Sequence, residues 1–87
     1  MISAHERADL IHIMKINRLT LIEADTAHLI FNEQTTGGDY EVSVLVIEDA
    51  PSVVIRKSGL PVHSETVKSV DDLKIFLEER LYKYLEV

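Results

Sequence analysis

Hydrophobic residues alternate with polar ones most regularly in residues 39–49, whose sequence is DYEVSVLVIED. Alternation with a period of two, carried by aromatic and β-branched side chains, is typical of a strand that has one face in a core. Leu45 and Ile47 make the second half of this stretch apolar on its other face as well. We therefore expect a central strand that is covered at least partly on both sides.

The start of the chain predicts a helix. Ser3 and Glu6 have the spacing of a capping box, with Ser3 as the N-cap, and the helix is expected from about Ala4 to Ile16. A strand that begins near Ile16 is an alternative, because residues 10–22 also contain alternating stretches. On a helical wheel, one apolar side collects Ala4, Ala8, Leu10, Ile11 and Met14.

Between this helix and the end of the chain, the pattern predicts four strands joined by short connections. The residues after the fourth strand, Ser58–Pro61, break regular structure, and residues 62–68 have no periodicity, so we expect an irregular crossing there. Asp25 favours a turn between the first two strands, and Gly37 and Gly38 lie in the next connection. The expected strands are Leu19–Glu23, Ala27–Glu33, the central strand at 39–49, and Ser52–Lys57.

The C-terminal part has the strongest helical pattern. Ser69 is the expected N-cap, Asp71 and Asp72 lie in the first turn where the helix dipole favours negative charge, and the helix is expected from Val70 to Glu86. The order α-β-β-β-β-α predicts one compact α+β domain over residues 1–87, a four-stranded antiparallel meander flanked by two helices. Whether the helices share one sheet face is left open. The apolar stripe of this helix comprises Val70, Leu73, Phe76, Leu77, Leu81, Tyr84 and Leu85.

Composition narrows the class of protein. The 87 residues carry a formal net charge of −6, from 15 acidic and 9 basic residues, and the basic residues are scattered, which disfavours direct nucleic-acid binding. The chain has no cysteine, so a disulfide or thiolate metal site is impossible. We find no signal-peptide pattern and no membrane span, and expect a cytoplasmic protein.

The second face of the expected sheet is more apolar than a normal solvent-exposed face and more polar than a normal core-facing one. We infer a protein-interaction module, a homodimer or an accessory or inhibitory subunit, with no catalytic site and no cofactor. Ile75 and Tyr82 lie opposite the main stripe of the second helix and are expected in the same interface. The interface prediction comprises Ile30, Leu45 and Ile47 with Ile75 and Tyr82, and the mixed face also collects Ile22, Val54, Thr20, His28, Asn32, Ser43 and Arg56.

Two other functions remain open. The net charge is compatible with an acidic inhibitor that mimics nucleic acid towards its enzyme. His5, Asp9 and His12 lie at i, i+4 and i+7 of the first helix, a possible divalent-metal site, although His5 and His12 are about 10 Å apart along the axis.

The other chemistry-bearing residues give weaker signals. His28 has no nucleophile beside it in the sequence, and the adjacent His63, Ser64 and Glu65 do not by themselves make a triad. The Gly37-Gly38 pair lacks the lysine and the following helix of a phosphate-binding loop.

Overall fold

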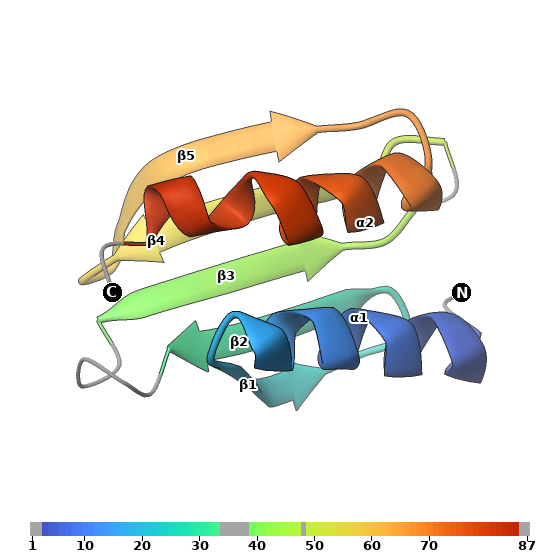
Figure 1. The fold of residues 1–87 in the computed structure, drawn as a ribbon, viewed down its shortest axis with the longest axis horizontal. Helices are drawn as coiled ribbons and strands as arrows, with labels where there is room; N and C mark the ends of the chain where they lie inside the picture. The colour runs from blue at the N-terminus through green and yellow to red at the C-terminus, as the bar shows by residue number, and fades with distance from the viewer. Residues whose placement is uncertain (1–2, 34–38, 48, 86–87) are drawn as a thin grey trace.

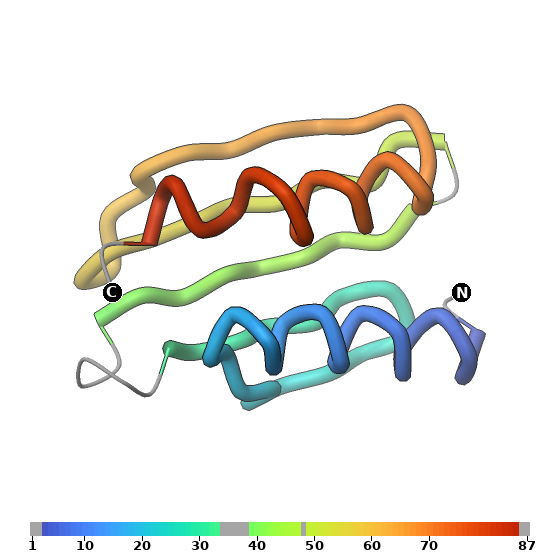
Figure 2. Tube along the Cα trace, viewed as in Figure 1, coloured from blue at the N-terminus to red at the C-terminus, as the bar shows by residue number. Residues whose placement is uncertain are grey.

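The computed structural model describes residues 3–33, 39–47 and 49–85, and in them two helices lie on one face of an antiparallel sheet (Figure 1). The described strands form a five-stranded meander in the order β1-β2-β3-β4-β5, so the class is α+β as predicted and β3 is the middle strand. The tube view shows α1 over one half of the sheet and α2 over the other (Figure 2). The elements are α1 (Ala4–Ile16), β1 (Leu19–Ala24), β2 (His28–Glu33), β3 (Tyr40–Leu45), β4 (Ser52–Lys57), β5 (Leu60–Thr66), α2 (Val70–Glu79) and the 3-10 helix η1 (Leu81–Tyr84).

The first helix has its predicted bounds, and the alternative of a strand near Ile16 is wrong. Ser3 caps α1: its Oγ accepts a hydrogen bond from the Glu6 amide at 3.1 Å, and its hydroxyl donates to the Glu6 carboxylate at 3.3 Å. Asn17 ends the helix, and its side-chain amide donates to the carbonyl oxygens of Ile13 at 3.1 Å and Leu77 at 3.2 Å. The last turn of α1 is thereby tied to α2.

The expectation of four strands and an irregular crossing is wrong, because residues 60–66 form a fifth strand, β5. Ser58 and Gly59 have φ angles of 52° and 84°, the two positive values of a type I′ hairpin turn, and they connect β4 directly to β5. The register places His63 and Glu65 of β5 on the same side as the buried residues of β4. Since the covered positions of this strand are polar, it has no hydrophobic alternation.

One face of the sheet forms the core with both helices. The stripe predicted for α2 is buried or partly buried, although the α-helix ends at Glu79 and η1 continues it. In α1 the buried side is rotated from the prediction, since Ile13 is in the core while Ala4 and Ala8 are exposed. The buried apolar residues are Leu10, Ile13, Met14, Leu19, Leu29, Phe31, Tyr40, Val42, Val44, Val46, Val53, Ile55, Leu73, Phe76, Leu77, Leu81 and Leu85.

The β4–β5 turn gives a test of the fifth strand. Gly59→Ala should lower the free energy of unfolding by about 1 kcal/mol, because a left-handed conformation costs any residue with a Cβ about that much. No heavy atom lies within 4 Å of the added Cβ, so steric contact would not contribute. Urea denaturation measures the change. Ser58→Asn is the control and should retain or raise the stability, since Asn tolerates positive φ; equal losses in both variants would contradict a type I′ turn.

Candidate functional site

The face of the sheet opposite the helices, which we call the open face, has no described element packed against it (Figure 1). The strand register arranges its side chains in three rows that cross the sheet. Side chains opposite one another in adjacent strands are about 5 Å apart, so each row is a continuous line of contacts. The rows are Thr20, Asn32, Glu41 and Arg56; Ile30, Ser43, Val54 and Ser64; and His28, Leu45, Ser52 and Thr66.

Apolar side chains gather in the middle of the open face. Ile30 and Val54 are half-buried and lie directly opposite Ser43 on either side, in β2 and β4. Leu45 in the next row is 37% exposed, and Ile47, just beyond β3, is 48% exposed. The predicted interface residues Ile30 and Leu45 therefore belong to one surface, and Ile47 is exposed two residues beyond Leu45. At the edge, the bulge in β1 leaves Ile22 55% exposed.

Polar side chains of the open face are hydrogen-bonded within the sheet. His28 Nε2 makes a short hydrogen bond with Ser43 Oγ, and the Asn32 amide donates to the Tyr40 carbonyl at 3.2 Å. A serine–histidine pair is the beginning of a nucleophilic site, but such a site also needs a group that orients the imidazole. Among the described residues no carboxylate hydrogen bonds to His28. The hydrogen bond joins the side chains of adjacent strands β2 and β3, and we expect it to contribute to the stability of the sheet.

Ile75 and Tyr82, the other part of the predicted interface, lie elsewhere. They are 50% and 58% exposed, on α2 and η1. At 100° per residue, Ile75 falls opposite the side of α2 that carries its buried residues, so it points away from the sheet. The predicted interface residues are thus divided between the helical side of the molecule and the open face.

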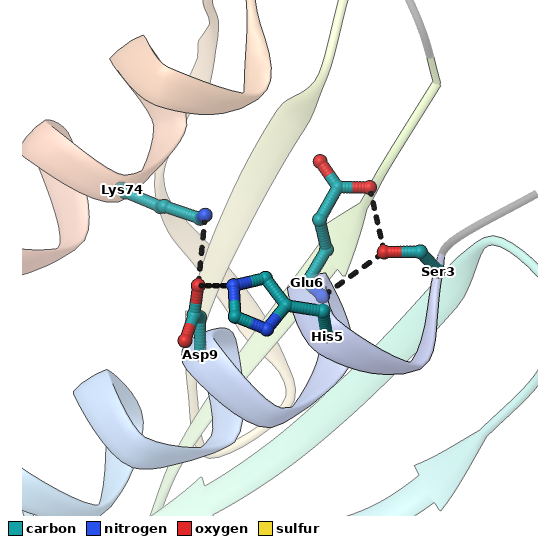
Figure 3. A network of polar contacts seen from close by, with 5 residues as sticks. All are labelled: Ser3, His5, Glu6, Asp9 and Lys74. Carbon is teal, nitrogen blue, oxygen red and sulfur yellow. Dashed lines mark hydrogen bonds and ion pairs between the residues drawn. The ribbon is translucent and has the colours of Figure 1, made fainter.

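His5 and Asp9 lie next to each other in the structure, and the Asp9 carboxylate also contacts a lysine of α2 (Figure 3). His5 Nε2 lies 3.5 Å from Asp9 Oδ2, and Lys74 Nζ of α2 lies 3.2 Å from the same oxygen. His12 is exposed and takes no part in this network. In the described part of the chain, no three His, Asp or Glu side chains are grouped so that they could hold a metal ion.

His63 belongs to a cluster that joins β5 to the C-terminal helices. Its ring stacks on Tyr84 with centroids 4.0 Å apart, and its Nε2 lies 3.2 Å from Glu65 Oε1. Arg80 donates to the other oxygen of Glu65 and lies over the Phe76 ring at 4.7 Å. The register places Ser64 on the open face, away from His63 and Glu65, so the three adjacent residues do not converge. The Gly37-Gly38 pair lies outside the described residues.

Sequence reasoning missed one buried charged residue. Glu33 is 0% exposed and lies opposite Leu19, on the covered side of the sheet. The signal was present, because the period of two that puts Leu29 and Phe31 in the core continues to Glu33.

Comparison of the chain with protein-family models, with curated proteins and with solved structures gives no match. Within the described residues, no helix combines the length and the apolar character needed to span a membrane.

The role of the histidine–serine pair can be measured. Ser43→Ala should lower the free energy of unfolding by about 1 kcal/mol, because it leaves a half-buried imidazole without its partner. Chemical denaturation measures the change, and Ser64→Ala, in the same row but exposed, is the matched control. If His28→Ala costs the same with and without Ser43, the two side chains are not coupled and the structural role is wrong.

Proposed function

We propose that this protein is a protein–protein interaction module that self-associates through its open face. The observation that carries the proposal is an uncovered sheet face with contiguous aliphatic side chains, Ile30, Leu45 and Val54, at its middle. A solvent-facing side of an antiparallel sheet is normally polar at these positions. Contiguous apolar surface on a small protein is typical of an interaction site.

A second copy of the chain is the occupant favoured by charge. Glu41 and Arg56 lie directly opposite each other in β3 and β4, so the open face presents one negative and one positive side chain next to each other. A two-fold axis parallel to the strands and midway between β3 and β4 would bring each Glu41 over the Arg56 of the second copy. Two-fold interfaces require this self-complementarity, and two stacked sheets keep their strands within about 30° of each other.

The size of the face is compatible with a dimer. Five strands about 4.8 Å apart, each of about six residues at 3.3 Å, give a face of about 24 × 20 Å, or about 480 Å² in projection. Two copies together would cover about 1,000 Å², which is near the lower limit for a specific interface. We therefore expect a reversible dimer rather than an obligate one.

The alternative functions have less support. The Asp9 carboxylate that a metal would need already contacts Lys74, and the acidic side chains of the described chain are distributed over helices, strands and connections alike. A dimer through the open face leaves the helical side, with Ile75 and Tyr82, exposed to other proteins.

Light scattering over a dilution series tests which surface mediates association. The unaltered protein should have the molar mass of a dimer at high micromolar concentration and dissociate on dilution. Val54→Asp should give a monomer at all concentrations, because an unpaired charge would be buried in the interface. Ile75→Asp, which puts the same charge on the helical side, should leave the dimer intact. A monomeric unaltered protein, or dissociation by Ile75→Asp alone, would refute the proposal.

The two-fold arrangement can be tested by exchanging charges. Glu41→Arg and Arg56→Glu should each weaken the dimer, since each variant alone would place like charges over one another. A mixture of the two variants should restore association, because each contact between unlike chains would then pair opposite charges. Light scattering of the separate and mixed variants measures this effect. No recovery on mixing would exclude the proposed axis, even if the open face is the interface.

A further inference from the structure

A groove follows one side of α1 and meets the edge strand β1 beside the C-terminal half of the helix. It consists of two adjoining hollows of about 370 and 260 Å³, which share Ile11 as a lining residue. The first is lined by Ala4, Arg7, Ala8 and Ile11, and the second by Ile11, Lys15 and residues 19–21 of β1. The α1 residues recur at spacings of three and four, so they form one side of the helix, the side next to the core-facing one.

Where the groove reaches β1, it lies next to an edge of the sheet. β1 pairs only with β2 within the described sheet, so alternate residues of β1 point backbone N–H and C=O groups outward. The opposite edge, β5, carries Pro61, which lacks a backbone N–H and so discourages the addition of another strand. In β1 the pairing with β2 is regular from Leu19 to Leu21 and shifts only after Leu21.

The groove is also basic, although the protein as a whole is acidic. Arg7 and Lys15 line its two hollows, while the formal net charge of the chain is −6. Arg7 is fixed in place by a hydrogen bond from its guanidinium to the Asp25 carbonyl at 3.3 Å. Between the two cations, Ile11 and Leu21 are partly buried and pack against the core, which leaves an apolar strip.

We propose that this groove binds an extended peptide segment of a partner protein, which adds to β1 as a further strand. Main-chain hydrogen bonds to β1 would supply affinity, and alternate apolar side chains of the peptide would pack on Ile11 and Leu21. Acidic side chains on the same face of the peptide would reach Arg7 or Lys15. The groove from Ala4 to Lys15 spans about 16 Å at the helical rise, which is the length of about five residues of a strand, and residues 19–21 of β1 line the part near Ile11 and Lys15.

Of the described lining residues only Thr20, at the edge of the sheet, also belongs to the open face, and the inference does not rest on the proposed dimer. A face-to-face dimer leaves the β1 edge accessible, and peptide binding is expected whether the protein is a monomer or a dimer. Light scattering on the Val54→Asp variant and peptide binding to the same variant therefore report on the two proposals separately.

A phage-displayed library of random dodecapeptides is the probe for a first test. Selection on the unaltered protein should enrich extended sequences in which apolar residues alternate and at least one acid is present. Fluorescence anisotropy with the synthetic peptides should then show binding at least tenfold weaker to Lys15→Glu and to Ala8→Gln, whose longer side chain would fill the groove. Both positions are exposed, so the fold should tolerate the changes. Lys68→Glu, the same charge change at an exposed residue outside the groove, should bind as the unaltered protein does.

Backbone methylation of the selected peptide tests strand addition itself. Methylating the alternate nitrogens that face β1 should abolish binding, whereas methylating the other set should leave it within about threefold. Failure to enrich any peptide, equal effects of the two methylation sets, or groove variants that bind normally would each overturn the inference. Enriched peptides that are basic rather than acidic would also contradict it.

Discussion

Burial of a single face of the sheet under both helices is the constraint on which the rest of the structure depends. Leu10 and Met14 of α1 and Phe76 and Leu77 of α2 are fully buried against the same side of the strands. Each such side chain contributes about 1.5–3 kcal/mol when removed from water. A chain of 87 residues can bury only a limited apolar surface. Because both helices pack on one face of the sheet, no described helix remains to cover the other face. The open face is therefore a direct consequence of how the core is built.

The two edges of the sheet differ because the helices meet them differently. At β5, the covered positions are His63 and Glu65, and the aromatic rings and Arg80 of the C-terminal helices pack directly on them. Pro61 also removes one backbone donor from that edge. At β1, Ile11 and Lys15 of α1 lie beside the strand, because Leu10, Ile13 and Met14 occupy the core. The small Ala4 and Ala8 lie on the same side of α1 and leave a hollow there, which larger side chains would fill.

The positions of helices and strands could be predicted from the sequence wherever a local signal determines the backbone conformation. The start of α1 follows from the cap at Ser3, and the start of β4 follows from the apolar residues after Pro51. β5 was missed because its inward-facing residues are polar and acquire their partners only through the tertiary fold, and because the Ser58-Gly59 turn was interpreted as a break. Among candidate site residues, alternation placed Ile30 and Leu45 on one face correctly. No local pattern could show that Lys74, 65 positions away, contacts Asp9, or that both helices choose the same face.

The polar groups of the open face also affect the free-energy cost of covering it with another molecule. Burying a hydrogen-bonding group without a partner costs about 1–3 kcal/mol, so a mixed face normally resists association. Here His28 and Ser43 satisfy each other, and the Asn32 amide is occupied by a carbonyl oxygen of the same sheet. Covering them would therefore remove few hydrogen bonds to water. The charged groups of the face whose desolvation does require compensation are Glu41 and Arg56, and these have opposite charge. Association should then depend less on apolar area than on whether the incoming surface presents the reverse arrangement of these two charges, which a second copy does by symmetry.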